Sequence, residues 1–195
     1  REEETGFDLD HRGGFLSVNT QHIGAIGTGA LALSLLLAAP ASAAFNSAYT
    51  DLDLDQCLVL DADDFGASWA CPGYRGYPLK VMEGDLRFSL AYGFGDNNQN
   101  GRQTLSPFNS LGPKLEWRLS NASGRWLPIA TIVRYHTADI VTGEDKGEVL
   151  VVSQIAEGNS CHIAYVDALV NADPNELARE AADKSGSFNC ATDEV

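Results

Sequence analysis

Two stretches of this sequence alternate between apolar and polar residues, and this period of two constrains the fold more than any other feature. Residues 86–92 carry Leu, Phe, Leu and Tyr at even positions, and residues 115–119 carry Leu, Trp and Leu at odd positions. Successive side chains of a strand point to opposite faces, so each stretch predicts a half-buried strand. Upstream, Leu79 and Val81 are apolar at odd positions, so the change of phase near Glu83 and Gly84 predicts a tight turn or a bulge.

Two further runs, residues 129–135 and 149–155, are apolar at nearly every position. Such runs are typical of strands covered on both faces, and the polar residues 142–147 between them predict a hairpin loop. Residues 161–166 predict another strand. We therefore expect a mainly β domain of about seven or eight strands, arranged as an antiparallel sandwich or a small barrel.

One α-helix is expected near the C-terminus. Asp173 can cap it, Pro174 suits its first position, Glu176 lies three residues after the cap, and Gly186 ends it. Its predicted apolar face is thin and rich in alanine, which allows close packing on a sheet. This face consists of Leu177, Ala178, Ala181 and Ala182.

The stretch from Ile23 to Ala44 is typical of a secretory signal peptide. Its apolar run is uncharged, Pro40 ends the run, and the small residues 41–43 match the pattern that signal peptidase cleaves. The alternative is a membrane anchor, because the run approaches the length of a spanning helix, but three glycines dilute its first part. We expect residues 1–43 to be a non-native N-terminal extension plus a cleaved signal peptide. Residues 44–195 are then a single exported β-rich domain, periplasmic or secreted.

The four cysteines all follow the predicted cleavage site. In an exported chain an even number of cysteines predicts disulfides, and of the three possible pairings the sequence favours Cys57 with Cys71 and Cys161 with Cys190. The runs 57–60 and 67–71 can form a hairpin that brings Cys57 opposite Cys71. The spacing of Cys and His residues gives a zinc site little support, and we expect no metal and no cofactor.

The charge of the chain restricts its partners. Asp and Glu number 27 against 13 Lys and Arg, which gives a net charge of −14. Such a chain repels nucleic acid and an anionic membrane surface, whereas a basic protein or another component of the cell envelope is compatible with it. Solubility is the simpler explanation of the acidity.

The stretch from Trp69 to Pro78, WACPGYRGYP, is the best candidate for binding. It combines three aromatic residues, one arginine, two glycines and two prolines directly after a predicted disulfide. Tyrosine, tryptophan and arginine dominate the energetics of protein interfaces, so we predict a partner-binding patch. Its residues are Trp69, Tyr74, Arg75 and Tyr77. The alternative is that Trp69 and one tyrosine belong to the core.

The sequence contains no convincing catalytic motif. Residues 96–101 match the opening of a calcium loop, but Pro107 occupies the position of its essential glutamate, so we interpret them as an ordinary polar loop. Cys161 and His162 are adjacent on a predicted strand and would point to opposite faces. We therefore expect a non-enzymatic acidic binding module, an inhibitor or scaffold for a basic envelope protein. The alternative is a hydrolase that uses Asp and Glu carboxylates scattered in the sequence.

These interpretations predict the covalent state of the isolated protein. Its first residue should lie within one or two positions of Ala44, and none of its cysteines should react with an alkylating agent before reduction. Intact-mass spectrometry tests both points. A retained N-terminal segment, or alkylation without reduction, would contradict the prediction of export with two disulfides.

Overall fold

The computed structural model describes residues 43–93, 103–139, 141–156 and 160–195, which all belong to one compact unit. The predicted signal peptide and the calcium-like loop Asp96–Gly101 lie outside the described residues. No helix in these four ranges is long and apolar enough to cross a membrane.

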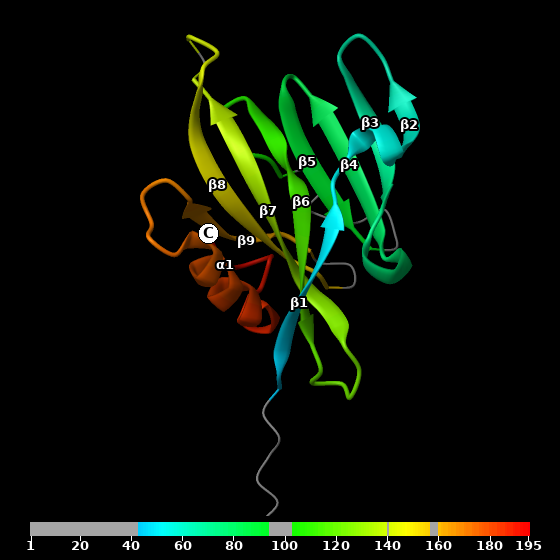
Figure 1. Cartoon of the computed structure of the whole chain (residues 1–195), viewed down its shortest axis with the longest axis vertical. Coiled ribbons are helices and arrows are strands. Elements are labelled where there is room, and N and C mark those ends of the chain that lie inside the picture. The colour runs from blue at the N-terminus through cyan, green and yellow to red at the C-terminus, as the bar shows by residue number, and fades with distance from the viewer. Residues whose placement is uncertain (1–42, 94–102, 140, 157–159) are drawn as a thin grey trace, which may run out of the picture. The chain divides into compact units, whose positions relative to one another are not determined.

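The described strands form two antiparallel sheets (Figure 1). The first sheet has the order β1 (Phe45–Asp51), β6 (Asn109–Ser120), β7 (Leu127–Ala138), β8 (Asp145–Gln154) and β9 (His162–Asp167). The second has the order β2 (Leu58–Ala62), β3 (Gly66–Pro72), β4 (Pro78–Gly84) and β5 (Arg87–Tyr92). The helix α1 spans Pro174–Asp183. The prediction of a mainly β fold with one C-terminal helix is confirmed, and β1 is an additional strand that the pattern did not reveal.

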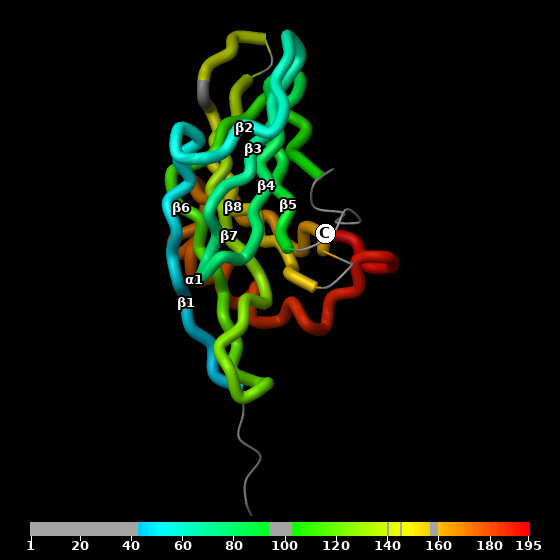
Figure 2. Tube along the Cα trace, turned by 90° about the vertical axis from the view of Figure 1, so that its right-hand side faces the viewer, coloured from blue at the N-terminus to red at the C-terminus, as the bar shows by residue number. Residues whose placement is uncertain are grey.

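A core of alternating apolar residues lies between the two sheets, which face each other in Figure 2. Leu115 and Trp117 of β6 are completely buried there, as is Val81 of β4. Leu90 and Tyr92 of β5 join them, so the positions predicted from the period of two do face the core, with the exception of Leu86. Burial of such side chains stabilises the fold by about 1.5–3 kcal/mol for each large residue.

A second apolar layer lies between the helix α1 and the outer face of the first sheet. Ala130 and Ile132 of β7 pack there against Ala178 and Ala182 of α1. This layer explains why residues 129–135 are apolar on both faces. Leu177, which was predicted to face the sheet, is instead 42% exposed, so small alanine side chains make the closest contacts of the helix.

The face of β6 that the alternation predicted to be solvent-exposed lies partly under α1, so Glu116 is buried and Arg118 is half-buried, whereas Lys114 is exposed. Glu116 is only 7% exposed, and its carboxylate accepts hydrogen bonds from Arg179 Nε at 2.7 Å and from the Ser47 hydroxyl. Arg118 Nη2 donates to Asp183 Oδ2 at 2.8 Å. The hydrogen bond that Arg179 donates to the Glu116 carboxylate raises the pKa of Arg179. Two ion pairs thus join the polar face of β6 to α1, although the alternating pattern of β6 predicted that this face is exposed to solvent.

The expected change of phase near Gly84 is a two-residue turn. Gly84 pairs with Arg87, and Asp85 and Leu86 between them have φ angles of 52° and 58°. This left-handed geometry is the one that tight hairpins require. The structure therefore places Leu86 in the turn, 62% exposed, and not on the buried face of β5 as its position in the alternation predicted.

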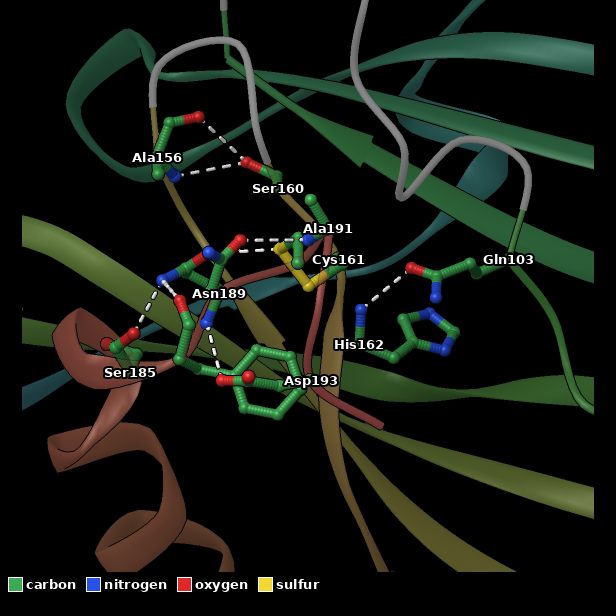
Figure 3. The surroundings of a disulfide bond; sticks show 12 residues. Gln103, Ala156, Ser160, Cys161, His162, Ser185, Asn189, Ala191 and Asp193 are labelled. Atoms are coloured by element: carbon green, nitrogen blue, oxygen red, sulfur yellow. Dashed lines mark hydrogen bonds between the residues drawn. A yellow bond between two sulfur atoms is a disulfide. The ribbon is translucent and has the colours of Figure 1, made fainter. Parts of the chain in front are cut away.

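Both predicted disulfides are present, and the described chain contains no free cysteine. Cys57 and Cys71, with Cα atoms 4.5 Å apart, close the β2–β3 hairpin. Cys161 and Cys190 join the start of β9 to the segment that follows α1 (Figure 3). Beside this bond, Gln154 Nε2 donates to the carbonyl oxygens of Ser185 and Phe188.

The ion pair between Arg179 and Glu116 gives a testable prediction. Arg179→Met should lower the free energy of unfolding by about 2 kcal/mol, because it leaves a buried carboxylate without its cation. Adding Glu116→Gln should recover part of that loss. The exposed pair of Lys114 and Asp51 is the control, and Lys114→Met should cost no more than about 0.5 kcal/mol. Equal losses for the two single variants in urea denaturation would show that α1 is not held by this pair.

Candidate functional site

A groove of about 540 Å³ lies between two loops that are far apart in the sequence. One wall is the 3₁₀ turn η2 (Tyr74–Gly76) between β3 and β4, and the other is the start of β7 with the residues before it. The lining residues are Tyr74, Arg75, Gly76, Tyr77, Arg125, Trp126, Leu127 and Pro128. Three of the four residues predicted to bind a partner therefore lie in one groove.

The first wall is a tightly constrained loop. The backbone amide of Tyr77 donates to the carbonyl oxygen of Tyr74 at 2.9 Å, and Arg75 and Gly76 have φ angles of 50° and 81°. At Gly73, an added Cβ would lie 2.1 Å from the carbonyl oxygen of Tyr77. Only glycine fits this approach, so the local sequence determines the shape of the wall.

Tyr77 also connects the loop to the core. Its ring packs edge-on against the buried ring of Trp117 with a centroid distance of 5.7 Å. An added Cβ at Gly73 would lie 2.9 Å from the same indole. Aromatic pairs in this arrangement contribute about 0.5–1.5 kcal/mol beyond their buried area. Tyr77 is therefore both part of the groove wall and an anchor for it.

Arg75 and Tyr74 supply charge and aromatic surface at the rim. The Arg75 side chain is exposed, and its guanidinium carbon lies 5.2 Å from the centroid of the Tyr74 ring. This cation–π contact orients the guanidinium while leaving its hydrogen-bond donors accessible.

The second wall comes from the β6–β7 hairpin. The amide of Gly124 donates to the carbonyl oxygen of Asn121 at 2.8 Å and closes the turn. Arg125 is exposed directly after it, and Trp126 and Leu127 remain 39% and 43% exposed. Within the described ranges neither Arg125 nor Arg75 takes part in an ion pair. Both cations are thus available to a ligand.

Trp69, the fourth residue predicted to bind a partner, does not line the groove. It lies in β3 beside the inter-sheet core and stacks on Phe88 with a centroid distance of 6.5 Å. The part of the site that the sequence did not predict, residues 125–128, comes from the end of the β6–β7 loop and the first two residues of β7, which belongs to the other sheet. Arg125 and Trp126 place an arginine next to an aromatic residue, as Tyr74 and Arg75 do in the first loop. This shared composition is the sequence feature from which the second wall could have been predicted.

A second hollow, of about 730 Å³, contains two carboxylates. It lies between the end of β1, Pro72 and the short turn η1 (Leu54–Gln56), and Asp51 and Asp53 both line it. Asp51 is paired with Lys114, and the Asp53 carboxylate accepts a hydrogen bond from the amide of Asp55. Both side chains are exposed, so the hollow lacks the buried, desolvated acid that glycoside hydrolysis requires.

The remaining candidates for chemistry are structural. The Cys161 sulfur is oxidised in a disulfide, which excludes it as a nucleophile. His162 beside it is 2% exposed, its ring nitrogen Nδ1 lies 3.0 Å from the Tyr165 hydroxyl, and burial lowers its pKa to about 4. Among the described residues, no group of three His, Cys, Asp or Glu side chains could hold a metal ion.

No family model, curated protein or solved structure matches this chain.

Proposed function

We propose that this protein is an exported, non-enzymatic binding module whose ligand occupies the groove between η2 and the β6–β7 hairpin. The observation that carries the proposal is the composition of the lining: aromatic rings on both walls and two arginines without carboxylate partners in the described chain. Ligand sites are concave, largely apolar and have a few polar groups that fix orientation, as this groove does. The lining contains no Asp, Glu, His, Ser or Cys side chain, which supports binding without catalysis.

The charge of the groove indicates the class of ligand. Arg75 and Arg125 form a local positive site on a chain whose net charge is −14, so the groove favours an anion over the basic partner expected from the overall charge. A guanidinium binds a carboxylate through two parallel hydrogen bonds. The tyrosine and tryptophan rings favour a flat apolar face next to that carboxylate. An oligosaccharide of uronic acids combines both features, because each pyranose ring has a C–H face and carries one carboxylate.

Export is supported by the two disulfides, which persist in oxidising compartments such as the periplasm or the extracellular space. The disulfide between Cys57 and Cys71 closes the hairpin whose second strand leads directly into η2. A covalent constraint at this position reduces the entropy that the loop loses on binding a ligand. The same disulfide therefore supports both export and a preformed binding loop.

Titration calorimetry with tetragalacturonate tests this function. The wild-type protein should bind it, and the methyl-esterified tetramer, which has the same rings without the charges, should bind at least about tenfold more weakly. Arg75→Gln and Arg125→Gln should each weaken binding about tenfold, because a hydrogen bond to a charged group is worth about 1.5–3 kcal/mol. Both side chains are exposed, so Tm should stay nearly unchanged.

Lys80→Gln is the matched control, since Lys80 is exposed on β4, lies outside the groove lining and carries the same charge. It should leave the affinity unchanged. Equal weakening by Lys80→Gln would assign the effect to overall charge, and equal binding of the ester would exclude an anionic ligand. Failure of wild-type protein to bind either tetramer would contradict the saccharide assignment.

A further inference from the structure

The strand β2 forms one edge of the second sheet (Figure 1). Among the described strands only β3 pairs with it, so the backbone groups along its other side have no strand partner there. Such an edge is a template on which a further strand can add through backbone hydrogen bonds. We call this strand with the residues that flank it, 53–64, the β2 edge.

Three consecutive apolar residues of the β2 edge are exposed. Leu58 is 68% exposed, Val59 is 55% exposed and Leu60 is 49% exposed. Val59 pairs with Trp69 of β3, which packs against the inter-sheet core, so Val59 continues this core to the margin of the sandwich. A strand added beside β2 would cover apolar surface that β3 alone leaves open to solvent.

The β2 edge suits a short partner. The strand is five residues long, and its register with β3 shifts between Val59 and Asp61. Such a bulge increases the local twist of a strand, so a long, flat strand would not follow it. A segment of a few extended residues is the length that this edge can pair with.

Carboxylates lie at both ends of the apolar run. Asp53 and Asp55 precede it, and Asp61, Asp63 and Asp64 follow it. All five side chains are exposed, and within the described ranges none of them takes part in an ion pair. The β2 edge is thus a short apolar run between two acidic ends.

Cations of the neighbouring elements do not neutralise these ends. Residues 52–74 contain no lysine or arginine. Lys114 pairs with Asp51, at the end of β1, and Arg87 of β5 pairs with Asp85. Both cations therefore have carboxylate partners outside the β2 edge.

Two further cations belong to the second sheet and its loops. Leu58 is level with Ala70 of β3 and with Lys80 of β4, so Lys80 lies two strands away, about 10 Å across the sheet. Arg75 lies in η2, beyond the end of β3, and lines the groove. Neither residue belongs to the β2 edge, which keeps its net negative charge.

This charge decides which strand can add. A second copy of β2 would bring a second set of the same carboxylates beside the first, and like charges on neighbouring strands repel. A basic segment would place its cations next to the carboxylates instead. The charge therefore disfavours self-association and favours a basic partner.

We infer that the β2 edge binds, by strand addition, a short extended segment of a partner protein in which lysine or arginine flanks a few β-forming residues. Backbone hydrogen bonds and the covered side chains provide the affinity, and the charges at the two ends select the segment. This inference does not depend on the proposed function of the groove, whose arginines favour an anion.

Fluorescence anisotropy with the labelled peptide KKTVTVTKK at about 0.15 M salt tests the inference. The wild-type protein should bind this peptide, and EETVTVTEE should not bind. The basic peptide N-methylated at its fourth and fifth residues should bind at least about tenfold more weakly, because it keeps every charge but lacks an amide donor on each of its edges.

The variant Asp61→Lys with Asp64→Lys tests the acidic ends. It should also bind the basic peptide at least about tenfold more weakly. Both side chains are exposed, so Tm should stay nearly unchanged. The matched control is Glu180→Lys with Glu194→Lys, which makes the same change of charge at exposed positions in α1 and near the C-terminus. This control should keep its affinity within about twofold of the wild type.

The inference is overturned if the wild-type protein does not bind KKTVTVTKK. Equal binding of the N-methylated peptide would show that no strand is added, and equal weakening by the control variant would assign the binding to overall charge. Dimerisation of the wild-type protein that excludes the peptide would identify a second copy of the chain as the occupant. Each of these results would contradict a basic partner segment on β2.

Discussion

The indole of Trp117 is the contact on which both the sandwich and the candidate groove depend. It is completely buried between the sheets, and its Nε1 donates to the Thr50 hydroxyl of β1 at 2.9 Å. The rings of Tyr77 and Tyr92 pack edge-on against it at centroid distances of 5.7 and 6.0 Å. One side chain of β6 therefore contacts β1, its neighbour in the first sheet, β5 at the edge of the second sheet, and the loop that forms a wall of the groove.

This arrangement separates stability from recognition within a single short loop. Tyr77 and Gly73 face the indole and hold the backbone, whereas Arg75 projects from a strained turn into solvent. The pattern recurs at the opposite end of the molecule, where the strained residue Leu86 is exposed beside well-packed strands. In both places the interior provides the free energy that maintains an unfavourable backbone conformation at the surface.

Local signals in the sequence predicted much of this fold. The alternation around Trp117 and the hairpin that brings Cys57 to Cys71 depend on neighbours in the chain, and both predictions are confirmed. The second wall of the groove exists because loops of the two sheets meet at one end of the molecule. An alternating pattern within one strand does not predict which loops of the two sheets lie side by side. The burial of Glu116 was missed for a similar reason. A polar strand face is predicted to be exposed to solvent unless it is known that a helix packs on it. Leu86 matches the alternating pattern that predicts a buried position, but it lies in the β4–β5 turn and is exposed.

Amide hydrogen exchange of the η2 loop tests most directly whether packing on Trp117 preforms the groove. In the wild-type protein the amide of Tyr77, which donates to the Tyr74 carbonyl, should be protected to a similar degree as amides of β4. Gly73→Ala should abolish that protection, because its Cβ cannot fit between the Tyr77 carbonyl and the indole. Gly186→Ala, which meets no atom within 4 Å, should leave the protection unchanged. Exchange of the wild-type Tyr77 amide at the rate of an unfolded chain would contradict a preformed groove.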